Sequence, residues 1–140
     1  MMILRPFNIN DAATILSWCK DNHAFRLWSA DRYRDFPAKP EEMTEQYKGD
    51  NMYPLTAVVG DAIVGHILLR FPSEDKSLIR FGFVIVDDSK RGKGYGKQML
   101  RLAVDYAPFS SVGLKFIEML FDVISLIKIF FGGSGLPKIK

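Results

Sequence analysis

The sequence predicts a mixed α/β fold, in which a mostly antiparallel central sheet is flanked by helices. Short apolar runs have strand character at residues 2–6, 55–59, 62–71 and 78–86. Helical spacing or helix-end signals mark residues 11–20, 40–48 and 97–107. The chain has 140 residues, a length that fits one domain with a core of its own.

The N-terminal half mixes strong signals with one segment that has none. Pro6 ends the first strand, and Asn8 or Asn10 is the expected cap of the helix that follows. Pro40 stands where a helix favours its first residue, and Gly49 lies past the expected end. Residues 22–38 are rich in aromatics and arginines but have no clean period, so we predict no helix or strand there.

The middle of the chain predicts a hairpin followed by a buried strand. Gly60 and Asp61 form a two-residue turn signal between the runs 55–59 and 62–71. A polar turn is expected at 72–76. The run 78–86 is apolar almost without a break, which predicts a strand buried on both faces.

The composition excludes several classes of protein. With 48% apolar and 25% charged residues, the chain is typical of a folded protein and not of a disordered one. The formal net charge of +3 fits an anionic ligand but is too weak to indicate nucleic acid. One cysteine excludes an internal disulfide, and the N-terminus has no secretory signal pattern, so we expect a cytoplasmic protein.

The most informative stretch is a glycine-rich loop between the buried strand and the last predicted helix. It reads Arg91-Gly92-Lys93-Gly94-Tyr95-Gly96. Glycines let neighbouring backbone N–H groups point the same way, and the start of the next helix adds N–H groups and partial positive charge. The loop therefore predicts a phosphate or pyrophosphate site. Its glycine spacing fits neither a P-loop nor the dinucleotide fingerprint.

This loop resembles the signature of the GNAT N-acetyltransferase superfamily, which is Gln or Arg, two residues, Gly, one residue, then Gly or Ala. The upstream order of strand, two helices, hairpin and long strand also resembles that family. The resemblance implies a GNAT-like fold whose usual C-terminal strands are lost or replaced. Residues 1–107 would form the acetyl-CoA-binding core, and residues 108–140 an atypical apolar segment of the same domain.

The resemblance also implies a reaction, in which a primary amine directly attacks acetyl-CoA, the cosubstrate. A backbone N–H near Val84 is the family-type donor to the thioester carbonyl oxygen. The pantetheine arm would pair with the strand end at Val84, Ile85 and Val86. The pyrophosphate would lie on the loop and the helix start, at Arg91, Gly92, Lys93, Gly94, Tyr95, Gly96 and Lys97. No metal is implied.

The base that takes the amine proton is not evident. An alkyl amine has a pKa near ~10.4, so it must lose a proton before it attacks. Candidates are Glu74 and Asp75 in a turn and His66 in a strand, although solvated turn acids and a packed histidine are the ordinary alternatives. His23 is expected to be structural. Three aromatics either line the acceptor pocket or pack in the core: Trp28, Tyr33 and Phe36.

The chain departs from the family after residue 107. The family's Asn-x-x-Ala-x-x-x-Tyr pattern, which supplies a coenzyme contact and an acid for the thiolate, is absent from residues 108–140. Tyr95 and Tyr106 are poor substitutes. Either the reading frame shifts near residue 107, or the segment is a genuine variant. Polar residues at steps of three and four predict an amphipathic helix over 112–131, with too many charges for a membrane span.

The tail also bears on assembly and on function. A sheet that ended at strand 78–86 would present an open edge, so the tail must cover it, pair with a second chain or aggregate. We predict a homodimer or oligomer formed through residues 116–131. Three functions remain open: an N-acetyltransferase, a catalytically weak acetyl-CoA-binding remnant, and a basic nucleic-acid or interaction module. The predicted partners are acetyl-CoA and an amine acceptor, without nucleic acid or membrane.

Overall fold

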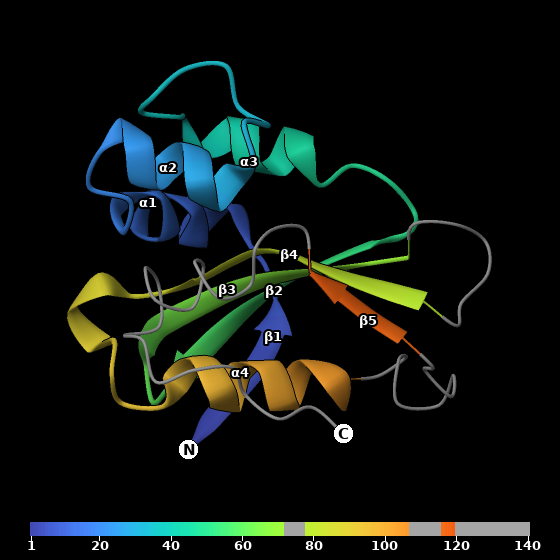
Figure 1. The fold of residues 1–140 in the computed structure, drawn as a ribbon. Helices are drawn as coiled ribbons and strands as arrows, with labels where there is room; N and C mark the ends of the chain where they lie inside the picture. Colours follow the sequence, from blue (N-terminus) through green and yellow to red (C-terminus); the bar gives the residue numbers. More distant parts are fainter. Residues whose placement is uncertain (72–77, 107–115, 120–140) are drawn as a thin grey trace.

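A central sheet carries α1, α2 and α3 on one face and α4 on the other (Figure 1). The computed structural model describes residues 1–71, 78–106 and 116–119. The elements are β1 (Met2–Pro6), α1 (Ile9–Ser17), α2 (Asn22–Ser29), α3 (Pro40–Gln46), β2 (Met52–Val59), β3 (Ala62–Arg70), β4 (Leu78–Val86), the 3-10 turn η1 (Asp88–Lys90), α4 (Tyr95–Val104) and β5 (Phe116–Met119). The strands lie in the order β1-β2-β3-β4-β5.

The sheet confirms the predicted fold class. The first four strands pair antiparallel, and β4 pairs parallel with β5. The β2–β3 hairpin turns at the predicted place, because Val59 pairs with Ala62 and Gly60 has a φ of +61°. Described residues 81–86 of β4 are all buried, as the unbroken apolar run predicts. The polar turn expected at 72–76 lies outside the described residues.

A buried carboxylate joins α1 to the first two strands. The N-cap of α1 is Asn8, whose side chain accepts from the Asn10 N–H, so the helix begins two residues before the predicted start. Asp11 is only 4% exposed and accepts two bonds from Arg5, at 2.8 and 2.9 Å. It also accepts from the Asn8 N–H at 3.0 Å and the Thr56 hydroxyl at 2.8 Å. Burial raises the pKa of the Asp11 carboxyl, but these donors outweigh burial and hold the pKa below its usual range.

The prediction that residues 22–38 contain no helix is wrong for the first part of this segment. Asp21 accepts a bond from the Ala24 N–H at 2.8 Å and caps α2. The helix buries Phe25, Trp28 and Ser29, which recur at steps of three and four. In the sequence this short stripe is hard to recognise, because aromatics and arginines continue past the end of the helix. The helix is therefore easier to recognise from the packing of its aromatic rings in the structure than from the period of its sequence.

The helix predicted over 112–131 is wrong where the structure describes that segment. Residues 116–119 form β5, which runs beside residues 78–81 of β4. The N-terminal half of β4 is thus covered by the same chain, one of the outcomes expected for its edge. Unpaired backbone groups of a strand favour pairing, and this non-local gain outweighs a local helical period. The rest of the predicted helix lies outside the described residues.

Candidate functional site

The C-terminal half of β4 is irregular. Its register with β3 shifts between His66 and Leu68, because β4 carries one extra residue there. Phe83 lies in this bulge and has a φ of 50°, in the left-handed region. A bulge bends its strand and redirects the backbone. Within the described residues, β5 stops at the level of Phe81, and no strand pairs with residues 82–86 on that side.

The backbone groups beyond the bulge face this uncovered edge. The Asp87 N–H donates to the Val64 carbonyl oxygen on β3 at 2.9 Å. Strand alternation therefore turns the backbone groups of Val86 and Val84 away from β3. On that side, the Val86 carbonyl oxygen accepts a bond from Arg91 Nε at 3.2 Å. Residues 82–86 thus present a short strand edge that suits an extended ligand with amide groups.

The loop after β4 opens with an acidic turn that is bonded within the protein. The Asp87 carboxylate accepts from the Ser89 N–H at 2.9 Å and from its hydroxyl at 2.8 Å. Lys20, in the turn between α1 and α2, has its Nζ 3.6 Å from Asp88 Oδ2. The acidic side chains therefore hold the loop and the α1–α2 turn together, and their charge is partly balanced.

The glycines of the loop have both open space and an unusual backbone. Gly92 and Gly94 each have a φ of +83°, a conformation that side chains other than glycine rarely adopt. Apart from its two chain neighbours, a Cβ atom built on either residue would meet no atom of the described residues within 4 Å. Glycine is therefore required by the backbone conformation and not by crowding.

Helix α4 begins two residues before the predicted start and has no side-chain cap. Gly94 is its N-cap residue, and the first intrahelical bond runs from the Gln98 N–H to the Gly94 carbonyl at 3.1 Å. The preceding N–H groups have no acceptor within a helix. They belong to Tyr95, Gly96 and Lys97. Uncapped N–H groups, the helix dipole and adjacent glycines together suit an anion.

Close packing holds the start of α4 against the end of β4. Gly65 pairs with Val86, and a Cβ atom on Gly65 would lie 2.7 Å from Met99 Sδ on α4. Gly96, Met99, Leu100 and Ala103 are the buried residues of this helix. The helix start is therefore fixed relative to the strand edge, as a site for one ligand that spans both elements requires.

The cationic residues around the loop differ in their contacts and their exposure. Arg91 turns back and donates to the end of β4, and burial lowers the pKa of its guanidinium. Lys93 is exposed and Lys97 is half-buried on α4. The expected positive charge of Arg91 is therefore committed to closing the loop on β4. The two lysines remain as the outward-facing cations.

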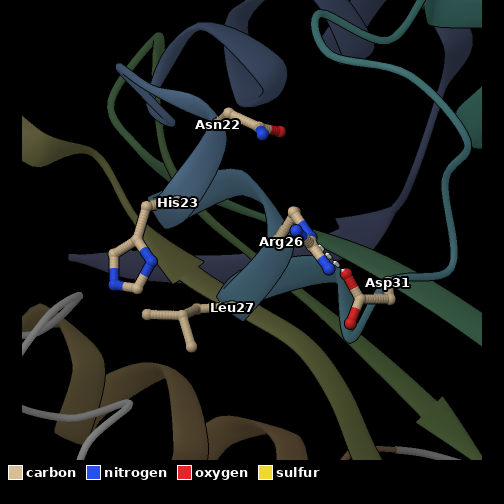
Figure 2. A pocket seen from close by; sticks show the side chains of 5 residues that line it. All are labelled: Asn22, His23, Arg26, Leu27 and Asp31. Carbon is tan, nitrogen blue, oxygen red and sulfur yellow. Dashed lines mark hydrogen bonds and ion pairs between the residues drawn. The ribbon is translucent and has the colours of Figure 1, made fainter.

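An opening lies beside α2, the helix that covers the opposite face of the sheet from α4. It has a volume of about 410 Å³ and is lined by Asn22, His23, Arg26, Leu27 and Asp31. Figure 2 shows His23 and Leu27 leaving α2 on one side, while Arg26 and Asp31 form an ion pair on another. Arg26 Nε lies 2.6 Å from Asp31 Oδ1. A second opening of about 470 Å³ shares Arg26 and Asp31 and extends to Arg34 and Asp35.

The residues proposed from the sequence as the catalytic base differ in where the structure places them. His66 is 0% exposed and shares a 2.6 Å hydrogen bond with the Tyr47 hydroxyl. Burial lowers the pKa of His66 to about 3, so the ring is neutral and sealed in the core. Glu74 and Asp75 lie outside the described residues. His23, for which a structural role was expected, is exposed.

The aromatic residues of the 22–38 segment divide between the two expected roles. Trp28 is fully buried, and its ring centroid lies 5.4 Å from that of Phe83. Tyr33 is also buried, 6.2 Å from Phe83 between ring centroids, but it borders the second opening. Phe36 is exposed. Trp28 of α2 and Tyr33, in the segment that follows α2, therefore both pack on the bulge of β4.

The described part of the chain shows neither a metal-binding cluster nor a membrane-spanning helix. Residues 1–71, 78–106 and 116–119 hold no group of three or more His, Cys, Asp or Glu side chains placed to bind a metal ion. None of the helices in these ranges is long and apolar enough to cross a membrane. Cys19 is buried, and burial raises the pKa of its thiol to about 12, as suits a core residue.

Solved structures with the same fold include two acetyltransferases with coenzyme A. A spermidine N-acetyltransferase from Vibrio cholerae, in complex with CoA and spermine, has a TM-score of 0.68 at 16% identity, covering 91% of this chain and 75% of that chain. An aminoglycoside acetyltransferase in complex with coenzyme A has a TM-score of 0.62 at 18% identity, covering 85% and 73%. At these identities the likeness shows the fold alone.

A third similar structure matches the whole length. A protein from Bacillus halodurans C-125 described as a transcriptional regulator has a TM-score of 0.64 at 18% identity, covering 100% of this chain and 99% of that chain. No curated protein matches the sequence. The family model described as an acetyltransferase (GNAT) domain matches residues 2–124. With the bulged strand, the glycine loop and the uncapped helix in their places, the chain belongs to the GNAT acetyltransferase family.

Proposed function

We propose that the protein transfers an acetyl group from acetyl-CoA to a primary amine by direct attack. The observation that carries this proposal is the edge at residues 82–86, with which no strand of the described residues pairs on the side away from β3, and which leads into the glycine loop and an uncapped helix. One continuous ligand with amides at one end of the site and a diphosphate at the other matches this arrangement.

The cosubstrate is proposed to lie along the site in a defined direction. The pantetheine arm lies along Val84, Ile85 and Val86, and its amides pair with the outward-facing backbone groups of Val84 and Val86, while those of Ile85 face β3. The diphosphate accepts from backbone N–H groups between Gly92 and Lys97, with Lys93 and Lys97 as outward-facing cations. Arg91 holds the loop against β4. This direction brings the thioester to the bulge at Phe83, where a redirected N–H stabilises negative charge on the carbonyl oxygen.

The acceptor is proposed to enter from the α2 side. The openings there are bordered by polar and charged side chains, among them Arg26, Asp31, Arg34 and Asp35. Acidic and basic residues are balanced in this set, so it gives no strong preference for a polycation. We propose a small polar amine as the acceptor. A cytoplasmic location and a homodimer through residues 116–131 remain predictions.

A second candidate is a coenzyme-binding protein with little catalysis. It is favoured by one sequence observation: residues 108–140 contain no Asn-x-x-Ala-x-x-x-Tyr pattern to supply an acid for the thiolate. The binding residues are the same in both proposals. Catalysis is therefore what separates them.

Calorimetry with CoA and a thiol-release assay test these proposals together. We expect micromolar CoA binding, and thiol release with at least one of spermidine, an aminoglycoside and a dipeptide. Binding without thiol release for any amine, at enzyme concentrations in the micromolar range, favours the second candidate. Absence of CoA binding by the folded protein overturns both and favours the basic interaction module.

A further inference from the structure

The bulge of β4 has a backbone conformation that its residue type does not favour. Within the described residues, positive φ outside glycine occurs at Ala30, Asp31 and Phe83. Ala30 is the C-cap of α2, where helices commonly end with a left-handed residue, and aspartate tolerates this region. Phe83 lies inside a strand and is bulky, so neither explanation applies to it. Such an outlier persists only where the surrounding contacts hold it.

Three aromatic rings hold the side chain of Phe83. The ring centroids of Trp28, Tyr33 and Tyr47 lie 5.4, 6.2 and 5.6 Å from that of Phe83, and all three contacts are edge-to-face. This geometry is favourable between aromatic rings and adds to the gain from burial. Phe83 itself is buried. We call these three rings the Phe83 cage.

One ring of the Phe83 cage also connects to the sheet just beyond the bulge. Tyr47 is the C-cap of α3 and shares a 2.6 Å hydrogen bond with His66 of β3. His66 pairs with Ile85, two residues after Phe83. The other two rings come from α2 and the segment that follows it, on the same face of the sheet (Figure 1). The helices on this face therefore contact both the bulge and the strand position after it.

A glycine would adopt the left-handed conformation of the bulge without strain. Gly60, Gly92 and Gly94 do so elsewhere in the chain. Gly82 stands directly before the bulge residue, but position 83 itself is phenylalanine. Phenylalanine is less favourable for this backbone, but it provides a side chain that the helices can hold.

We infer that Phe83 is a positioning residue, whose caged side chain keeps the bulge in the conformation that turns an N–H toward the thioester carbonyl oxygen. This inference rests on the proposed acetyl transfer. Pairing with β3 at Gly82 and Ile85 sets the register on both sides of the bulge. Loss of the side chain therefore changes the direction of the peptide groups between them more than the path of the strand. Because the donor acts on charge that develops during the reaction, turnover should suffer more than binding.

One pair of substitutions at Phe83, and the same pair at Phe81, test this role in the full-length protein. Phe83→Ala and Phe83→Gly both remove the ring, but only glycine favours the left-handed backbone. Phe81 is buried on the same strand and has no positive φ. The measurements are thiol release with the best amine among spermidine, an aminoglycoside and a dipeptide, CoA calorimetry and urea denaturation. Kinetics are compared at a temperature where the variants are folded.

We expect Phe83→Ala to lower kcat by about 100-fold, the effect of losing one such donor, with CoA affinity within about threefold of wild type. Phe83→Gly should retain about ten times the kcat of Phe83→Ala and should unfold at no lower urea concentration. Phe81→Gly should be no more active than Phe81→Ala and less stable, since glycine weakens a regular strand. A merely structural phenylalanine would give the same order at both positions.

Trp28 provides a second comparison, which leaves residue 83 intact and applies even where a variant at that position does not fold. Trp28→Phe keeps an aromatic ring beside Phe83, and Trp28→Leu removes it. We expect kcat of Trp28→Leu to be about tenfold below that of Trp28→Phe, the upper range for one aromatic pair. CoA affinity should be equal in the two variants.

The contrary outcomes separate this inference from the proposed function. If the wild type turns over, equal kcat in the two Phe83 variants, or in the two Trp28 variants, overturns the role of Phe83 and leaves acetyl transfer standing. The same order of glycine and alanine at positions 81 and 83 overturns it too. CoA binding without wild-type turnover for any amine overturns acetyl transfer, and the role of Phe83 with it.

Discussion

The region around β1 and the region around β4 use their polar groups differently; they are called here the β1 side and the β4 side of the sheet. At the β1 side, all five residues of β1 pair with β2 in unbroken register, and Asp11 joins α1 to both strands through Arg5 and Thr56. At the β4 side, a bulge, a left-handed Phe83 and an uncapped helix start lie next to one another. Polar groups bonded within the protein stabilise the fold but are lost to ligands. The first side therefore contributes bonded polar groups to stability, and the second is where the proposed binding site lies.

The largest effect on stability is expected from Asp11→Ala. It leaves a buried Thr56 hydroxyl and the Asn8 N–H without their acceptor, and it removes the partner of Arg5. We expect a loss of about 3 kcal/mol in the free energy of unfolding, measured by urea denaturation. CoA affinity at a temperature where the variant is folded should stay within twofold. A tenfold loss of affinity would show that the two sides of the sheet are not independent.

The largest effect on binding is expected from Gly94→Val, with Gly60→Val as its matched control. Both glycines have positive φ and open space, so both variants bear a similar backbone strain of roughly 1–2 kcal/mol. Only Gly94 borders the helix start. Calorimetry should show at least 30-fold weaker CoA binding, about 2 kcal/mol, for Gly94→Val alone. Equal affinities of the two variants would remove the loop from the binding site.

Acid should weaken the β1 side first. The pKa of Asp11 is held below its usual value in the folded protein, so its contribution is present above roughly pH 4, where the unfolded carboxyl titrates. That contribution is lost as pH falls through the folded pKa, since protonation removes the charge that Arg5 binds. The free energy of unfolding measured between pH 2 and 6 should fall less steeply for Asp11→Asn than for wild type. Parallel curves would contradict this assignment.

The smallest effects are expected from Lys93→Gln and Lys97→Gln. Both cations are at least partly exposed, so each should contribute roughly 0.3–1 kcal/mol to CoA binding, a two- to fivefold change in affinity. The decrease of affinity with added salt should be shallower in each variant, because a screened charge has been removed. Lys48→Gln, on an exposed position after α3, is the control and should leave both quantities unchanged.

Local signals in the sequence were sufficient for much of the fold. Gly60 marked the β2–β3 turn, and the apolar run ending at Val86 marked the buried strand. Two elements were missed because distant partners stabilise them. Helix α2 is held by Trp28 on Phe83, far along the chain, and β5 is held by the edge of β4. Neither contact leaves a strong local period.

The candidate site shows the same division. The glycine loop and its position between strand and helix were evident from residue types, because positive φ and close phosphate approach both favour glycine. The burial of one histidine and the exposure of the other were not evident from residue types. His66 is buried by Tyr47, nineteen residues away in the chain, and His23 is exposed by a helix that the sequence did not predict.

By itself, the sequence determined the family loop, the order of most elements and the lack of an ionisable side chain on the strand end, because these depend on residue type and local spacing. Only the tertiary structure decided that Arg91 turns inward, that His66 is buried while His23 is exposed, and that residues 116–119 pair with the first half of β4. Burial and strand pairing depend on residues brought together from far apart in the chain, and no local pattern encodes them.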